Sequence, residues 1–271
     1  MSTESQNSPP PLVSIDGAIG AIADATISIS DDGLLRGDGV FEVAKLYRGV
    51  PYALDEHLDR IEHSAAAITL PIDRDSLQGE ITALIETAEF EGEATLRLVC
   101  TRGGRRIAML EPLPQWPETT TLATITYAPS VILTGVKSIS YAANMQATRA
   151  AQQRGAAEAL LVREDGLILE APTSSIFWVG ADGVMRTPAL DCGLLDSITR
   201  RRILEATEVE QGHYHGADLE GASEAFIASS TREVQAVAAI DGVALTNPPG
   251  PRTTAAAAAL AAAVRAALAR V

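Results

Sequence analysis

The stretch Val136-Lys137-Ser138-Ile139-Ser140-Tyr141 contains one of only two lysines in a chain of 271 residues. A lysine amine whose pKa is lowered by burial is a nucleophile that can form a Schiff base with an aldehyde. Lys137 follows Thr134-Gly135 and precedes an apolar-flanked stretch, so it is a candidate for this chemistry. The alternative is a surface lysine that follows a loop.

The second lysine, Lys45, lies in residues 41–47, where apolar and polar side chains alternate as in a strand. Lysine side chains are rarely buried, so we expect Lys45 at the surface or at the rim of a sheet. Any mechanism that requires a lysine amine therefore has Lys137 as its main candidate.

Composition excludes several classes of protein. The chain has 21 Lys and Arg against 35 Asp and Glu, a net charge of −14, which argues against binding to nucleic acid or to anionic lipid. The two cysteines, Cys100 and Cys192, are too few for a disulfide framework. We find no signal pattern, no apolar run long enough for a membrane span and no metal-ligand motif. We therefore expect a cytoplasmic protein without a metal.

The order of predicted elements indicates an α+β fold, because strands cluster between helices without regular βαβ alternation. Residues 111–117 contain three prolines and are the best candidate for a linker. We accordingly predict a flexible tail at 1–11, a small domain at 12–116 and a large domain at 117–271.

Glu170 ends the otherwise apolar stretch 166–170, which is predicted to be a strand. A carboxylate at a strand end that faces a pocket can hold a proton on a heteroaromatic nitrogen and keep the ring electron-poor. The alternative is an ordinary acidic residue at the start of a loop.

Two hydroxyl-bearing turns could bind an anion. Residues 196–200 (DSITR) are typical of a helix start, where backbone N–H groups attract anions. Residues 229–231 (SST) follow a short apolar strand. Each turn alone could simply cap a helix. Together with an arginine and Lys137, they fit an aldehyde cofactor that carries a phosphate.

The order of these motifs is itself informative. Residues 36–42 (RGDGVFE) are followed by 56–61 (EHLDRI) and Ser64-Ala65, then by 136–141, 159–162, Gly166 and Glu170, and finally by 197–200 (SITR). From about residue 13 to about 245 the chain resembles the class IV pyridoxal-phosphate-dependent aminotransferases of fold type IV. That family includes D-amino acid aminotransferases, branched-chain aminotransferases and aminodeoxychorismate lyases.

The resemblance implies a small N-terminal α/β domain and a larger, β-barrel-like C-terminal domain with helices. It also implies pyridoxal 5'-phosphate as cofactor and a homodimer with the active site at the subunit interface. Lys137 would form the internal aldimine and act as acid and base, and Glu170 would pair with the pyridine nitrogen. Arg60 would bind the phosphate.

The remaining positions follow from the same resemblance. Ile198, Thr199 and Ser229 or Ser230 would complete the phosphate site. Tyr141 falls where some relatives place a tyrosine near the cofactor's 3'-oxygen. Phe41 falls where several relatives have a pocket-lining tyrosine, so the hydroxyl is absent here. Ser197 replaces the usual glycine, which would alter how closely the backbone approaches the phosphate.

The reaction is inferred from departures within the family pattern. The lyases commonly have threonine after the aromatic residue of the first motif, whereas this chain has Glu42, as transaminases often do. We therefore expect a transaminase that acts on D-amino acids, with extension to (R)-amines, and uses a 2-oxo acid such as 2-oxoglutarate. Aminodeoxychorismate lyase and branched-chain L-amino acid aminotransferase are the alternatives.

The substrate carboxylate requires a cation, and three arginines are candidates. The arginine-x-histidine pattern usual in D-amino acid enzymes is missing, because Arg105 is followed by Arg106 and Ile107. Arg97 matches a strand position that points toward the active site in branched-chain enzymes. Arg97 could also form an ion pair at the strand rim, and Arg105 and Arg106 could belong to a solvated loop.

Overall fold

The computed structural model describes residues 8–270 and divides the chain into two compact units. The first unit comprises the described residues up to Pro114, together with Val136–Tyr141 and Arg270. The second comprises Gln115–Gly135 and Ala142–Ala269. Lys137 thus belongs to the first unit, although most of the sequence around it belongs to the second. Residues 1–7 of the predicted tail lie outside the described part of the chain.

An antiparallel sheet of six strands, in the order β2-β1-β6-β5-β3-β4, forms the framework of the first unit. Its long central strands β3 and β5 pair from Gly39↔Thr101 to Leu46↔Ala94. The strands are β1 (Leu12–Ile15), β2 (Ala18–Ala21), β3 (Gly39–Tyr47), β4 (Val50–Pro51), β5 (Ala94–Thr101) and β6 (Arg106–Pro112).

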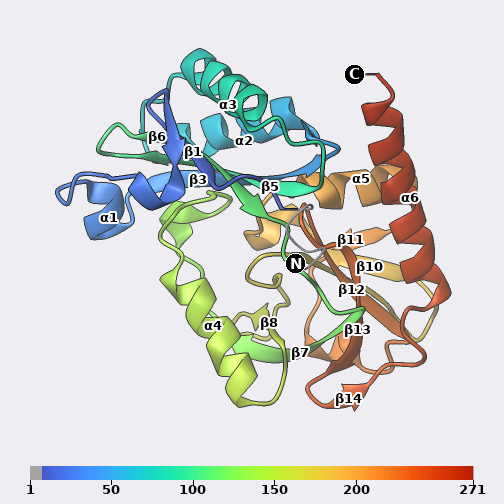
Figure 1. Cartoon of the computed structure of the whole chain (residues 1–271). Coiled ribbons are helices and arrows are strands. Elements are labelled where there is room, and N and C mark those ends of the chain that lie inside the picture. Colours follow the sequence, from blue (N-terminus) through green and yellow to red (C-terminus); the bar gives the residue numbers. More distant parts are fainter. Residues whose placement is uncertain (1–7, 271) are drawn as a thin grey trace. The chain divides into compact units, whose positions relative to one another are not determined.

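Helices α2 (Leu54–Ala67) and α3 (Arg74–Ala88) pack on one face of this sheet (Figure 1). Alternate residues of β3, among them Val40, Ala44 and Leu46, are buried against Leu58 and Ile61 of α2. Because successive strand residues point to opposite faces, the same alternation places Glu42 on this buried face. The unit also contains the short helices η2 (Ile22–Asp24) and α1 (Asp32–Arg36).

A mixed sheet that curls into a half-barrel forms the framework of the second unit (Figure 1). The strand order is β11-β10-β9-β12-β13-β7-β8, and β14 pairs with β13. The pairs β10–β11, β13–β7 and β7–β8 are parallel. The strands are β7 (Thr119–Thr126), β8 (Glu158–Val162), β9 (Ser175–Val179), β10 (Met185–Pro188), β11 (Glu210–Gly212), β12 (Glu224–Ser229), β13 (Glu233–Ile240) and β14 (Val243–Ala244).

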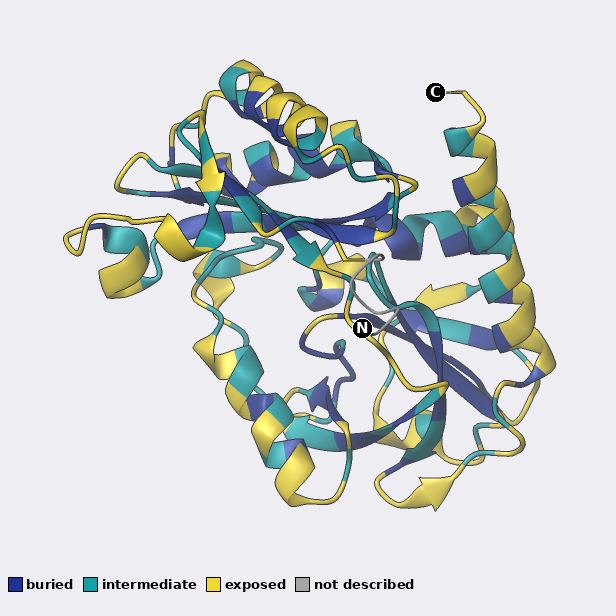
Figure 2. Ribbon diagram, in the orientation of Figure 1, coloured by how far each residue is buried: buried dark blue, intermediate teal, exposed yellow. Residues whose placement is uncertain are grey.

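Three helices cover the second sheet. Helix α4 (Ala142–Gln153) packs on β7 and β8, whereas α5 (Ile198–Ala206) and α6 (Pro251–Leu268) pack on each other and on β12. The alanine-rich α6 buries only a narrow stripe, Thr253, Ala256, Leu260 and Val264, and exposes its outer side (Figure 2). Short 3-10 turns complete the unit: η3 (Val131–Leu133), η4 (Leu190–Cys192) and η5 (Gly216–Leu219).

The α+β fold class predicted from the sequence is confirmed, since one unit is an antiparallel sheet with helices on one face and the other is a mixed sheet with helices. Within residues 8–270, each helix is too short or too polar to cross a bilayer. The fold places the predicted site residues in two groups, one in each unit.

Candidate active site

The segment that carries Lys137 is attached by its backbone to the start of β3. The Phe41 N–H donates to the Lys137 carbonyl at 3.0 Å, and the Ile139 N–H donates to the Gly39 carbonyl at 3.1 Å. Val40 and Ser138 form an isolated antiparallel bridge between these bonds. The lysine is therefore held on an extra, short strand at the edge of the first unit's framework.

Two side chains secure this segment further. The Lys137 N–H donates to the Ser64 hydroxyl of α2 at 3.1 Å, and the Ser140 hydroxyl donates to the Gly37 carbonyl at 2.8 Å. Gly37 has φ +67°, and a Cβ at this position would come within 2.9 Å of Ser140 Oγ. Glycine is thus required by both backbone conformation and close approach.

The side chain of Lys137 lies against an aromatic pair. Its Nζ is 4.3 Å from the Phe41 ring centroid, and the Tyr141 ring meets Phe41 edge-on with centroids 5.4 Å apart. The structure therefore brings together three residues that the sequence singled out separately. Contact with the aromatic face limits the directions that the Lys137 side chain can take.

Lys45 is not at the surface, so that prediction is wrong. Only 6% of the residue is exposed, its Nζ lies 3.1 Å from the Glu93 carboxylate, and it stacks over Tyr47 at 4.4 Å. The aliphatic stem is buried while the ammonium meets the half-exposed carboxylate of Glu93, an arrangement that long cationic side chains commonly adopt.

Arg60 lies on α2, one helical turn before Ser64, and its guanidinium contacts a buried carboxylate. Arg60 Nε donates to Glu42 Oε1 at 2.6 Å, and a terminal nitrogen donates to Oε2 at 2.8 Å. His57 Nδ1 lies 2.8 Å from the same Oε2, and the Val43 N–H donates to it at 3.1 Å. Sequence reasoning used Glu42 only as a family marker and did not anticipate this network.

Glu42 is ionised in this network. Burial alone would raise the pKa of its carboxyl group, but the hydrogen bonds and charge of Arg60, together with the His57 contact, outweigh burial and hold the pKa far below its ordinary value. A bidentate pair with an ionised carboxylate fixes both the position and the plane of the guanidinium.

The three candidate carboxylate-binding arginines each form an ion pair within the first unit. Arg97 Nε lies 2.8 Å from Glu111, Arg105 lies 2.5 Å from Asp16, and Arg106 lies 2.7 Å from Glu80. Glu80 is 9% exposed and the side chains of the other two acids about 30%, so the Arg106 pair is the most enclosed. All three guanidiniums already face a carboxylate.

Glu170, in the second unit, is held near the start of α5. The Leu195 N–H donates to Glu170 Oε1 at 3.2 Å, and Leu195 precedes the N-cap residue Ser197 by two positions. Burial, and then the charge of Glu170, raise the pKa of the neighbouring Tyr127. This carboxylate therefore lies beside the predicted anion site, a proximity that sequence spacing did not reveal.

The N-terminus of α5 has the properties of an anion site. Ser197 caps the helix by accepting from the Arg200 N–H at 3.2 Å, and Ile198 and Thr199 in the first turn are buried. First-turn N–H groups lack partners within the helix and attract anions. Ser197 has φ −76°, which any residue adopts, so the position does not require the glycine usual in the family.

Arg200 anchors this end of the helix. It is 1% exposed and donates to the carbonyl of Pro188, the last residue of β10, and to Oε1 of Gln211 in β11, both at 2.8 Å. Burial lowers the pKa of its guanidinium. The first turn of α5 is thereby tied to the sheet.

The second hydroxyl turn is also braced by an arginine. Ser229 ends β12 and accepts from the Arg232 N–H at 3.4 Å, and Ser230 follows it in the turn. The Arg232 guanidinium stacks on Trp116 at 3.7 Å and donates to Glu158 at 2.8 Å. The hydroxyl groups of this turn are thus held on a buried, ion-paired support.

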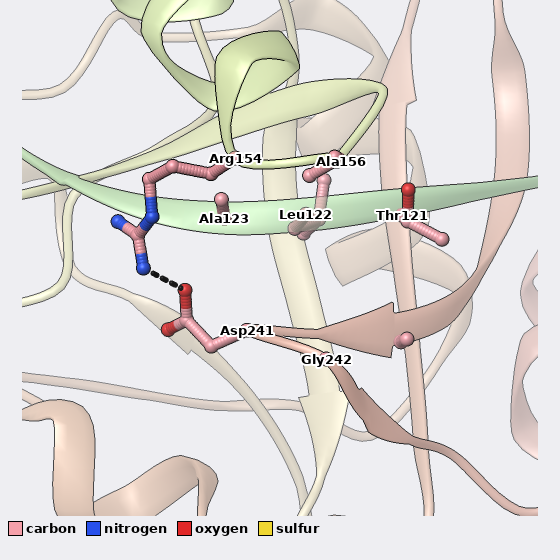
Figure 3. Close-up of a pocket in the computed structure, with 9 residues that line it drawn as sticks. Thr121, Leu122, Ala123, Arg154, Ala156, Asp241 and Gly242 are labelled. Atoms are coloured by element: carbon pink, nitrogen blue, oxygen red, sulfur yellow. Dashed lines mark hydrogen bonds and ion pairs between the residues drawn. The ribbon is translucent and has the colours of Figure 1, made fainter.

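A pocket of about 210 Å³ lies elsewhere in the second unit (Figure 3). None of the predicted site residues lines it. Its charged residues, Arg154 and Asp241, pair with each other at 3.0 Å, and Asp241 also accepts from Thr124. The pocket is therefore separate from the two groups of predicted site residues described above.

Comparisons with known proteins identify the family. Residues 39–240 match the family model described as amino-transferase class IV. The chain is 31% identical to a Methanocaldococcus jannaschii protein provisionally named a branched-chain-amino-acid aminotransferase, covering 83% of this chain and 86% of that protein. It is 32% identical to the Listeria monocytogenes D-alanine aminotransferase (81% and 84%) and 28% identical to the Bacillus subtilis aminodeoxychorismate lyase (90% and 92%).

Solved structures agree with this assignment. A fold IV transaminase from Curtobacterium pusillum is 28% identical and has a TM-score of 0.83, with 91% of each chain covered. A hypothetical aminotransferase from Mycobacterium tuberculosis, solved in its PLP-bound form, shares the fold with a TM-score of 0.84 at 23% identity, over 94% of this chain and 99% of that one. The chain belongs to the class IV aminotransferases. It is a pyridoxal-phosphate-dependent enzyme of fold type IV.

The described residues fit this cofactor by the chemistry of their donors. An amine, a carboxylate and a helix N-terminus flanked by hydroxyl groups match an aldehyde, a pyridine nitrogen and a phosphate, respectively. Within its own unit, each of Lys137, Glu170 and the start of α5 is held by hydrogen bonds that involve the backbone.

Proposed function

We propose that the chain is a transaminase that moves an amino group from a D-amino acid to a 2-oxo acid such as 2-oxoglutarate, with (R)-amines as further donors. The observation that carries the cofactor-dependent part of the proposal is the placement of Lys137, whose backbone is fixed to β3 and α2 and whose amine lies over Phe41. A lysine held in this way is suited to carry the cofactor and to move a proton.

Each residue then has a stated task. Lys137 would hold the cofactor through its amine and transfer the proton at the substrate Cα, with Tyr141 and Phe41 beside it. Glu170 would keep a proton on the pyridine nitrogen. Pyridoxal 5'-phosphate, when bound, supplies the electron sink for the reaction. The phosphate would be held by Arg60 and by the group Ser197, Ile198, Thr199, Ser229 and Ser230.

Large apolar side chains exposed in both units support the expectation of a homodimer. Ile29, Leu34 and Leu35 in the first unit are 52–78% exposed, and Val131 and Ile132 in the second are more than 80% exposed. Exposed apolar clusters commonly mark protein–protein interfaces. We infer that a second copy of the chain covers them.

The choice among substrates is tested with a donor panel. We expect purified enzyme to form keto acid from D-alanine or D-glutamate with 2-oxoglutarate, and to convert L-leucine at least about tenfold more slowly, the factor that 1.4 kcal/mol of discrimination gives. Bleaching of the cofactor absorbance by each donor is the measurement. Keto acid from L-leucine alone would support the branched-chain alternative, and release of pyruvate from aminodeoxychorismate without an acceptor would support the lyase.

Single replacements by glutamine distinguish the three candidate arginines. We expect one of Arg97→Gln, Arg105→Gln and Arg106→Gln to raise the KM for the amino donor by about 10- to 100-fold, because a charge-assisted hydrogen bond to its carboxylate is lost. The other two should change KM by less than about threefold, since an arginine that does not contact the substrate carboxylate loses no bond to it. If all three variants kept the KM of the unsubstituted enzyme, these arginines would be excluded from substrate binding.

A further inference from the structure

We propose that Glu42 is a positioning residue: it holds the Arg60 guanidinium in the orientation that binds the cofactor phosphate, with His57 supporting the carboxylate. The inference rests on the proposed function, in which Arg60 is a phosphate ligand. It adds to the proposed function a role for Glu42 and His57, two buried residues that the reaction does not otherwise use.

Glu42 grips one edge of the Arg60 guanidinium. Glu42 Oε1 accepts from Arg60 Nε at 2.6 Å and Oε2 accepts from a terminal nitrogen at 2.8 Å, so one edge of the guanidinium is engaged at both ends. Arg60 itself is about 10% exposed and Glu42 is fully buried. A guanidinium has five N–H groups in a fixed fork, so a partner on one edge determines where the others point.

Glu42 occupies a position where a charged side chain is costly. Its strand neighbours on the same face, Val40 and Ala44, belong to the apolar core with Leu58 and Ile61 of α2. A carboxylate on such a face loses its hydration, and a buried ion pair is often no more stable than apolar residues of similar size. A structural role in the core is therefore a poor reason for a charged residue here, whereas orienting a ligand-binding arginine is a sufficient one.

His57 is 1% exposed and contacts the same carboxylate. An ionised carboxylate only accepts hydrogen bonds, so His57 Nδ1 must carry the proton and donate it. Together with the Val43 N–H, this bond holds Oε2, the same oxygen that accepts from the terminal nitrogen of Arg60. The carboxylate is thus a rigid support for the arginine.

Simple electrostatics predicts the opposite effect, which makes the proposal testable. The negative charge of Glu42 lowers the positive potential around Arg60, so its removal alone would strengthen the binding of a phosphate dianion. If orientation dominates, removing the carboxylate weakens phosphate binding despite the more favourable charge. The sign of the change therefore separates the two effects.

The test compares pyridoxal 5'-phosphate with pyridoxal, which lacks the phosphate, as ligands of the apoenzyme. In Glu42→Gln we expect the affinity for pyridoxal 5'-phosphate to fall at least about tenfold, because a misoriented Arg60 loses a charge-assisted hydrogen bond to the phosphate. The affinity for pyridoxal should change less than about twofold. Unchanged or increased affinity for pyridoxal 5'-phosphate would overturn the proposal. An equal loss for both ligands would also overturn it, because that result indicates general damage to the fold.

Three further variants complete the experiment. Glu224→Gln removes another buried carboxylate, which bonds Thr253 and Arg252 in the second unit, and should leave both affinities unchanged. His57→Asn keeps a donor near the Nδ1 position and should retain the phosphate preference, whereas His57→Ala should reduce it. Arg60→Gln tests whether Arg60 binds the phosphate at all. If this variant still prefers pyridoxal 5'-phosphate over pyridoxal, the proposed role of Arg60 is wrong. If the preference is lost in Arg60→Gln but kept in Glu42→Gln, only the positioning role of Glu42 is rejected.

Discussion

Replacing Lys137 by alanine should abolish the absorbance of the bound cofactor and lower turnover at least about 1,000-fold, the scale seen when a covalent catalytic residue is removed. The backbone bonds of Lys137 to Phe41 and Ser64 do not involve its side chain, so the variant should fold normally. The absorbance spectrum, single-turnover keto acid formation and a thermal melt together measure these effects.

Lys45→Met is the matched control, since Lys45 is the only other lysine in the chain. Methionine retains the buried stem but removes the ammonium that meets Glu93, so we expect a modest loss of stability and an unchanged cofactor spectrum. If Lys45→Met lost the cofactor absorbance while Lys137→Ala kept it, the assignment of the reactive amine would be wrong.

The sequence indicated the local features of the candidate site. Lys137 and Glu170 each lie in a short motif whose order along the chain indicates the family, and the α5 N-cap at Ser197 is a local signal as well. The fold class also followed from the order of strands and helices. These features depend on neighbours within a few residues, so that periodicity and motif spacing were sufficient.

What could not be predicted depends on partners distant along the chain. Glu42 meets His57 and Arg60 only because β3 packs on α2, and Leu195 meets Glu170 across 25 residues. One signal was present in the sequence: Glu42 interrupts an apolar face in which Val40, Ala44 and Leu46 alternate. A charged residue at such a position requires a buried partner, but the alternation does not identify it.

The arginines and Lys45 illustrate the same limit. Arg97 pairs with Glu111 from the adjacent strand β6, and Arg106 pairs with Glu80 from α3, so their neighbours follow from strand register and helix packing. Lys45 was expected at the surface because most lysines are found there, whereas Glu93 and Tyr47 allow it to be buried. Residue type alone gives only an average environment.

Glu170→Gln should lower kcat about 100- to 1,000-fold while the cofactor remains bound, because an amide cannot keep a proton on the pyridine nitrogen and general acid–base contributions are of this size. The glutamine carbonyl can still accept from the Leu195 N–H, so the local fold should persist. The cofactor spectrum, kcat and the donor KM measure the effect.

An independent readout separates the loss of charge from a change in structure. The charge of Glu170 contributes to the raised pKa of Tyr127, after burial, so Glu170→Gln should bring that pKa part of the way back toward its ordinary value. Spectroscopic titration of the tyrosines, with Tyr127→Phe to assign the transition, measures the shift. A shift in the pKa of Tyr127 would show that the negative charge of Glu170 was removed as intended. If turnover stayed normal in the same variant, catalysis would not depend on that charge. Glu170 would then be excluded as the partner of the pyridine nitrogen.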